Sequence, residues 1–266
     1  MQVLTNKTFD RVGHRTYRDR IVDLEDWEIS DCSFESCGST GNTHGFRLSN
    51  IHLKNCEFSN CIIGSPNFDI LAEDVSLHSC QQFSSSLCNA TLRRVKVQSL
   101  RTTGGRGARG VFMLWGCRFD SVVLCGKIGA IKLNLYPSID WTIDRDSDRD
   151  TAWKRELMRF YDSVQTALDI TAATFTAGMS LHALPGDKIQ HDPTTAVLID
   201  RATWAGLDIE KIQHPASSLS ICIEWFLAES PFATSLLVAS GKGKQKDEDL
   251  AFIDWIRSEG LSYAGR

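Results

Sequence analysis

Apolar and polar residues in the first half of the chain alternate in a pattern that repeats at a fixed interval. Three segments superpose without gaps at an offset of 24 residues, namely 27–37, 51–61 and 75–80. Each places a cysteine in one column and a large aliphatic residue in another, which gives the columns Cys32, Cys56, Cys80 and Ile29, Leu53, Leu77. Self-similarity of this kind is typical of repeat architectures.

Within each copy the apolar residues recur at steps of two and then three, so the repeating unit is five residues long. A strand alternates strictly and a helix repeats every 3.6 residues, and neither gives this pattern. A chain that turns a corner every five residues does. Two looser copies are present at 95–100, after a shorter offset, and at 112–119, where Cys117-Arg-Phe119 restores the Cys-x-Phe pair.

The triplets Cys32-Ser-Phe34, Cys56-Glu-Phe58 and Cys117-Arg-Phe119 resemble the unit of pentapeptide-repeat proteins. In that family a small residue is followed by Asn or Asp and then by Leu or Phe. The resemblance covers residues of about 20 to 135 and departs at the second position, which is Ser, Glu or Arg here. It implies a right-handed β-solenoid in which each coil takes about 20 residues and is stabilised by stacking on its neighbours.

Three domains are expected. Open coil ends expose strand edges, so residues 1–20, with Val3, Leu4, Phe9 and Tyr17, are expected to form an N-terminal cap. The β-solenoid then occupies 21–138, and its other end must be covered by the second half of the chain. After the polar run Asp144–Asp150 the spacing becomes helical, which predicts a mainly α-helical domain over 150–266. Its predicted helices lie from Ala152 to about Ile170, at 194–207, at 217–229 and at 248–259.

Composition and charge limit the expected binding partners, location and metal content of the protein. The net charge of −4 predicts no general affinity for nucleic acid or for anionic membranes. The N-terminal segment has no apolar signal-peptide core, and no stretch reaches the roughly 18 to 20 apolar residues of a membrane span, so we expect a cytoplasmic protein. The nine cysteines are odd in number and lack C-x₂-C spacing, which favours buried thiols over disulfides or zinc. We expect no cofactor and no metal.

Charge is unevenly distributed along the predicted solenoid. No Lys or Arg occurs from 21 to 46, and no acid from 75 to 119. Because complementary charge on a flat surface steers and selects partners, these two groups are the candidate partner-binding residues. The acidic group is Asp23, Glu25, Asp26, Glu28, Asp31 and Glu35, and the basic group is Arg93, Arg94, Arg101, Arg106 and Arg109.

No catalytic residue can be assigned. The glycine-rich segment 101–110 lacks the G-x-x-x-x-G-K-[ST] pattern of a phosphate loop, and Gly178-Met-Ser180-Leu-His182 is not a G-x-S-x-G elbow. We therefore expect His182, His191 and His214 to be structural or surface residues.

Three classes of function remain. We favour a non-catalytic protein-binding or inhibitory protein, with bacterial toxin-neutralising immunity proteins as the preferred class. The resemblance also implies an alternative, a DNA-mimicking topoisomerase-binding protein, which needs sustained negative potential. Residues 1–140 contain 16 Lys/Arg and 14 Asp/Glu, a net +2, which argues against it. The third class is a carbohydrate-active β-helix enzyme, whose groove lined by several acids is not visible in the sequence.

Overall fold

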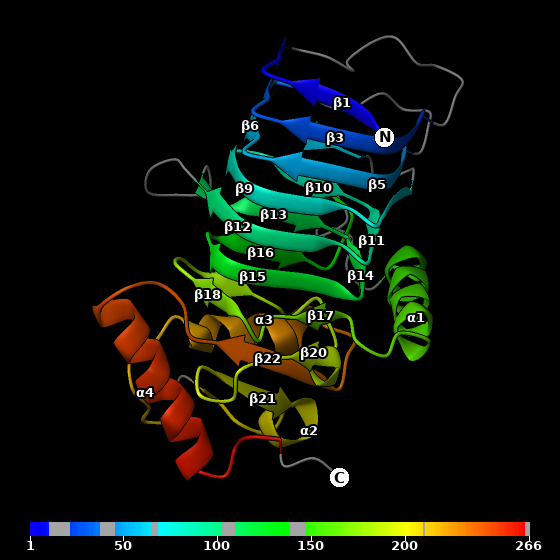
Figure 1. Ribbon diagram of the computed structural model, residues 1–266. Coiled ribbons are helices and arrows are strands. Elements are labelled where there is room, and N and C mark those ends of the chain that lie inside the picture. The colour runs from blue at the N-terminus through cyan, green and yellow to red at the C-terminus, as the bar shows by residue number, and fades with distance from the viewer. Residues whose placement is uncertain are drawn as a thin grey trace.

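The computed structural model is a curled sheet of mostly parallel strands, followed by a smaller part that combines helices with two antiparallel strands (Figure 1). The structure describes residues 1–10, 22–37, 46–64, 69–102, 110–138, 147–209 and 211–263, without the side chains of 22–24 and 46. Among these residues, no helix has the length and apolar character needed to cross a membrane.

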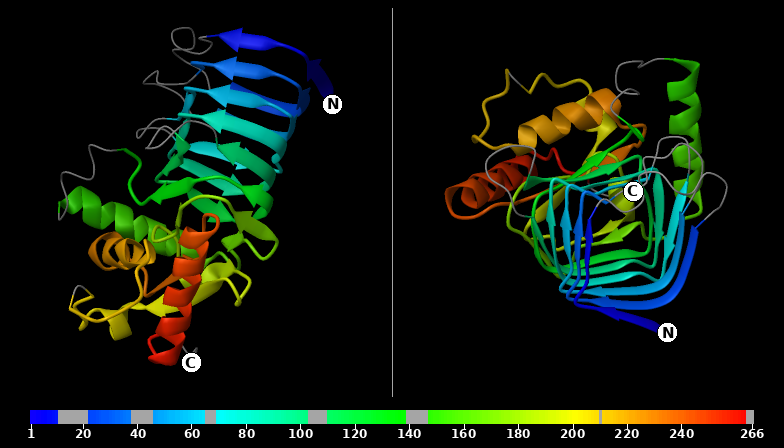
Figure 2. Two further views of the ribbon diagram at one scale, coloured as in Figure 1. Left: turned by 90° about the vertical axis from the view of Figure 1, so that its left-hand side faces the viewer. Right: turned by 90° about the horizontal axis from the view of Figure 1, so that it is seen from above.

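Successive strands run around four sides, so that the chain comes back alongside its own earlier part and pairs with it in parallel (Figure 2). We call this arrangement the strand stack and one circuit around it a coil. The first side carries the first halves of β3 (Val22–Ser30) and β5 (Phe46–Lys54), then β8 (Ile70–Glu73), β11 (Ala90–Arg93) and β14 (Arg118–Asp120). The second carries β1 (Gln2–Thr5), the second halves of β3 and β5, the first halves of β9 (Ser76–Phe83), β12 (Lys96–Thr102) and β15 (Val122–Ile128), then β17 (Leu168–Asp169) and β20 (Ile189–Gln190).

The other two sides complete the circuit. The third carries β2 (Thr8–Asp10), β4 (Ser33–Glu35), β6 (Glu57–Ser59), the second halves of β9, β12 and β15, and β18 (Ala173–Phe175). The fourth carries β7 (Ile62–Ile63), β10 (Ser86–Cys88), β13 (Phe112–Trp115), β16 (Ile131–Asn134) and β19 (Met179–Ser180).

Register agrees with the sequence repeat in four of its five copies. Ile29 pairs with Leu53 and Leu53 with Leu77, each 24 residues later, and Leu77 pairs with Val97 after 20 residues. The fifth copy is in a different column, because Leu114 pairs with Leu87. Its cysteine therefore comes after the strand of the fourth side rather than the second, and it does not continue the first cysteine column.

Corners of the stack are marked by residues with positive φ at steps of five. The longest uninterrupted series is Asp74, Ser79, Ser84, Asn89, Arg94 and Ser99, with φ between 49° and 60°. Apart from glycine, short polar residues tolerate this left-handed conformation best, because their side chains can bond locally. The residue after each corner points inward, which produces the two-then-three spacing of apolar positions.

Cysteines fill one inward column of the stack. Cys32, Cys56 and Cys80 are at most 2% exposed, and the Cys56 thiol donates to the Ile29 carbonyl of the preceding coil at 3.5 Å. Leu100 pairs with Cys80 and continues the column. All nine cysteines are free, and five of them are buried, so they act mainly as small apolar core residues.

Helix α1 (Asp148–Asp162) interrupts the stack and takes the place of a strand on its first side (Figure 1). Ser147 caps it by accepting from the Asp150 amide, and the Tyr161 hydroxyl accepts from the Phe119 amide of β14 at 3.1 Å. The predicted helix therefore ends at Asp162 and not near Ile170. The parallel sheet also resumes beyond the predicted boundary at 138, since β15 pairs with β17, and Val122 lies opposite Leu168.

The C-terminal part is built on the antiparallel pair β21 (Ala196–Asp200) and β22 (Thr234–Val238). The predicted helix at 194–207 is wrong in its first half, because the run Ala196-Val-Leu-Ile199 pairs as a strand and only α2 (Arg201–Trp204) is helical. The helices predicted at 217–229 and 248–259 are confirmed as α3 (Leu219–Glu229) and α4 (Lys244–Ser258), the latter starting four residues earlier.

The two ends of the stack differ in how they are covered. At the C-terminal end, Ala196, Leu236 and Val238 join the core of the stack, while the other face of their sheet packs on α3 and α4 in a second core. At the N-terminal end, Val3 is 64% exposed. Residues 2–5 and 8–10 of the predicted cap are strands of the first coil, and Tyr17 lies outside the described residues.

Candidate functional site

One corner of the stack carries a charged edge that runs through five coils. It consists of the last residue of each strand on the first side together with the corner residue next to it. From the N-terminal end the pairs are Glu25 and Asp26, Ser49 and Asn50, Glu73 and Asp74, Arg93 and Arg94, and Asp120 and Ser121. We call these ten residues the charged edge.

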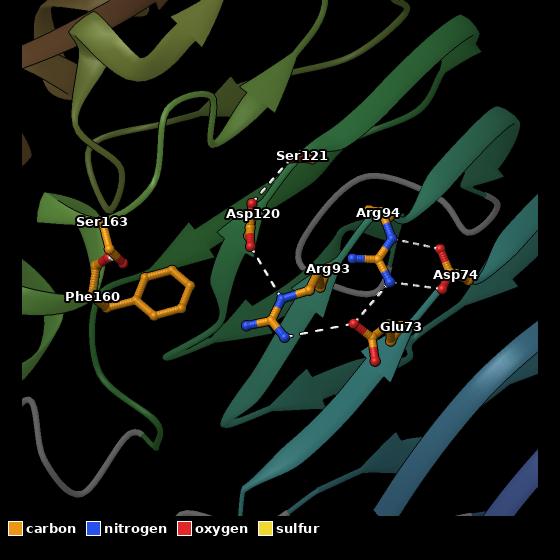
Figure 3. Close-up of polar contacts among 8 residues, drawn as sticks. All are labelled: Glu73, Asp74, Arg93, Arg94, Asp120, Ser121, Phe160 and Ser163. Carbon is orange, nitrogen blue, oxygen red and sulfur yellow. Dashed lines mark hydrogen bonds and ion pairs between the residues drawn. The ribbon is translucent and has the colours of Figure 1, made fainter.

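Both arginines of the charged edge are held by carboxylates of neighbouring coils (Figure 3). Arg93 lies 3.5 Å from Glu73 in the preceding coil and 3.1 Å from Asp120 in the following coil. Arg94 lies 2.8 Å from Glu73 and 2.7 Å from Asp74. The predicted partner-binding residues Arg93 and Arg94 are therefore together on one edge, but they are neutralised within the chain.

These contacts set the ionisation of the corner. Hydrogen bonds from Arg94 hold the pKa of Asp74 below its usual range, and the same carboxylates raise the pKa of Arg94. Asp74 is therefore ionised throughout the physiological pH range, and the pair is lost only in acid, as the pH falls through the lowered pKa. Both side chains are half exposed, so salt screens the interaction.

The predicted acidic residues surround the coil instead of lining one flat face. Glu25, Glu28 and Glu35 lie on the first, second and third sides, and Asp26 and Asp31 lie at the two corners between them. All five are exposed. Only a partner that approaches along the stack axis could meet all of them, because the sides of the stack face in different directions.

Most of this negative charge has no internal counter-charge. Asp26 accepts from the Asn50 amide at 2.6 Å and Asp31 from the Asn55 amide at 3.1 Å, so their partners are neutral. Within the described part of the chain, neither Glu25, Glu28 nor Glu35 forms an ion pair. The side chain of Asp23 is not among those that the structure describes.

Basic residues gather three coils further along the axis. Arg101 is exposed on the third side and pairs in register with Gln81, which in turn pairs with Glu57. The predicted residues Arg106 and Arg109 lie outside the described residues. At a strand spacing of about 4.8 Å, three coils separate the acidic and basic groups by about 14 Å along the axis.

Three charged residues of the charged edge were not predicted as site residues, namely Glu73, Asp74 and Asp120. The repeat itself contained the signal for two of them, because Glu73-Asp74 lies two offsets of 24 after Glu25-Asp26. The same alignment places Arg93-Arg94 one shorter coil later. Extending the repeat from its apolar columns to its polar positions would have revealed that these charges share one corner.

A buried polar network lies between the stack and α3. Ser180 Oγ is 2.8 Å from His182 Nδ1, and His182 Nε2 is 3.5 Å from a carboxylate oxygen of Glu229. Serine, histidine and an acid in contact are the components of a nucleophilic triad. Here Ser180 is 6% exposed and His182 is 2% exposed. A nucleophile must reach its substrate, so this network serves to hold β19 against α3.

The described residues contain no group of three or more His, Cys, Asp or Glu side chains arranged to hold a metal ion.

The fold places the chain among proteins built on a curled sheet of mostly parallel strands. No family model matches the chain, and no curated protein matches it in sequence.

Among solved structures, the chain is similar to QnrB1, a plasmid-mediated fluoroquinolone resistance protein. The identity is 9%, the match covers 72% of this chain and 91% of that chain, and the TM-score is 0.21. A likeness at this level carries no argument about what this chain binds.

Proposed function

We propose that this chain is a non-catalytic protein-binding or inhibitory protein, and that its strand stack is a right-handed pentapeptide-like β-solenoid that serves as a rigid contact surface. The observation that carries the proposal is the unpaired acidic ring of Glu25, Glu28 and Glu35, together with the two corner carboxylates. Charge of one sign that is exposed and not used internally is available to steer and select a partner of the opposite sign.

The chemistry of the partner is set by this ring. A protein with a basic surface would be attracted along the stack axis toward the N-terminal coils, since the basic group lies three coils away. To inhibit such a partner, this chain needs only to cover the partner's active surface. Bacterial toxin-neutralising immunity proteins work in this way, and we propose this class for the chain. The charged edge argues against a DNA mimic, because its sign changes from Asp74 to Arg94 and back at Asp120.

The test is affinity purification from the cells that make the protein, with the chain as bait. We compare the wild type with the triple variant Glu25→Gln, Glu28→Gln, Glu35→Gln. The control carries Asp162→Asn at the end of α1, with Glu224→Gln and Glu259→Gln in the C-terminal part; all three acids are exposed, and the net charge equals that of the first triple variant. We expect a stoichiometric basic partner with the wild type and the control and little with the first triple variant. Absence of any stoichiometric partner would contradict the proposal, and so would equal recovery with all three baits.

A further inference from the structure

The N-terminal coil of the stack presents a strand edge that no described strand covers. β1 pairs with β3 on one edge, and the described residues place no strand on the other. Its outward-facing Val3 is 64% exposed and Met1 is 69% exposed. Backbone amides and carbonyls along a free edge can pair with another extended chain. The opposite end of the stack, in contrast, is covered by the β21–β22 sheet.

The side chains of this coil continue the columns of the stack. Phe9 stacks on Phe34 with ring centroids 5.0 Å apart, and Phe34 stacks on Phe58 at 5.2 Å. Leu4 continues the inward aliphatic column one coil before Ile29 and packs against the core. A further strand on this edge would therefore need apolar residues where it passes over Leu4 and Phe9.

The outward positions of the next coil, one strand in from the edge, include acids. Glu28 lies next to Val3 in register, and Glu35 lies next to Asp10. Residues 1–37 contain eight acids and five Lys or Arg, a net charge of −3 in the sequence. A second copy of the chain on this edge would bring two such coils together and be repelled. A strand with basic outward residues would be attracted.

We propose that the free edge of β1 binds an extended segment of a partner protein, in which basic residues alternate with apolar ones, as an added strand. Along β1 an apolar residue would cover Leu4, and the outward basic residues would lie two strand spacings, or about 10 Å, from Glu28, with Glu35 beyond the next corner. This inference rests on the proposed function and names the contact by which a basic partner is held. Main-chain hydrogen bonds provide affinity in this mode of recognition, and the alternating side chains provide specificity.

The test uses the full chain and a fluorescent nine-residue peptide in which lysine alternates with valine. Binding is measured by fluorescence anisotropy, and the bound site is mapped by hydrogen exchange. We expect the peptide to protect those amides of Gln2–Thr5 that point toward the free edge. The variant Glu25→Gln, Glu28→Gln, Glu35→Gln should bind about tenfold more weakly, since three exposed charges together contribute about one factor of ten in affinity. The control variant Asp162→Asn, Glu224→Gln, Glu259→Gln should bind like the wild type.

Two modified peptides separate strand addition from simple charge attraction. A peptide with alternate amides N-methylated keeps its charge but cannot pair with the edge, and it should bind at least about tenfold more weakly. A peptide with glutamate in place of lysine should not bind. Equal weakening by both triple variants, or full binding of the N-methylated peptide, would overturn the proposal. So would a concentration-dependent dimer of the chain alone that Val3→Lys abolishes, because a second copy would then occupy the edge.

The two proposals fail separately. If a stoichiometric partner is recovered and its recovery depends on the three glutamates, but the peptide leaves the β1 amides unprotected, only the edge proposal is contradicted. If no partner is recovered, the proposed function is contradicted, even if the peptide binds.

Discussion

Arg94 and Asp74 lie at the same corner of adjacent coils, 20 residues apart in sequence, and the guanidinium donates to both carboxylate oxygens at 2.7 and 2.8 Å. Arg94 holds this position with φ at +50°, a conformation that short polar residues and glycine adopt more readily. The corner thus combines a backbone cost with an ion pair that joins two coils.

Substitutions at Arg94 should separate these two effects. Arg94→Gly removes the ion pair but relieves the backbone, so we expect its Tm to stay close to that of the wild type. Arg94→Val removes the ion pair and places a β-branched residue at positive φ, so its Tm should be clearly lower. Thermal unfolding followed by circular dichroism measures both. Equal Tm values for the two variants would contradict the corner geometry.

Gly64 marks a corner where no other residue fits. Its φ is +96°, and an added Cβ would lie 2.0 Å from the Cys88 carbonyl oxygen. We expect Gly64→Ala to destabilise the chain by about 2 to 4 kcal/mol, because the strand of the next coil must shift. Gly178→Ala is the matched control, since nothing lies within 4 Å of its added Cβ. Urea unfolding gives both values, and similar losses for the two variants would be the contrary result.

Arg201 caps the C-terminal end of α3. Its guanidinium donates to the carbonyls of Phe226, Leu227 and Ser230 at 2.7, 2.8 and 2.5 Å. Replacing it by methionine leaves these carbonyls without their donor, so we expect a loss of about 2 to 4 kcal/mol, with Arg201→Lys losing less. Chemical unfolding is the measurement. A stable Arg201→Met variant would show that the cap contributes nothing.

Alkaline pH should weaken the fold through the thiols of Cys117, which is buried, and Cys222, which is half-buried. Burial raises the pKa of Cys117 to about 12 and that of Cys222 to about 12, from an ordinary value of 9.0. Because the folded-state pKa is the higher one, the stability from these groups is complete below pH 9 and falls as the pH rises toward 12. The urea midpoint should therefore drop between pH 9 and 12 and drop less in Cys117→Ala. If the urea midpoint of Cys117→Ala falls with pH as steeply as that of the wild type, the loss of stability comes from other groups, such as the buried Tyr161 hydroxyl.

Much of the stack could be predicted because the spacing of its inward apolar residues repeats in every coil. The inward columns that contain Cys56 and Leu53 are read directly from the spacing, since each coil buries its side chains only against the next. The fifth copy was misplaced because Cys117 and Phe119 satisfy the same Cys-x-Phe pattern on another side of the coil. The pattern specifies the five-residue unit but not which of the four sides it occupies.

The other features that differ from the sequence prediction all depend on contacts between parts of the chain that are distant in sequence. Apolar runs such as Ala196–Ile199 are compatible with a strand or a buried helix, and only the partner strand β22 decides between them. Helix α1 replaces a strand on the first side, which leaves the spacing from Val122 to Leu168 far from any repeat length. The neutralisation of Arg93 depends on contacts between coils, which the local sequence does not contain.

The proposed binding surface is tested at residue level by the hydrogen-exchange footprint of the partner recovered with the wild-type chain. We predict that the complex protects residues 2–10 and 25–35, where the free edge and the acidic ring lie, and leaves α3 and α4 unchanged. Protection confined to α3 and α4, with the N-terminal coils exchanging as in the free chain, would contradict the proposed function.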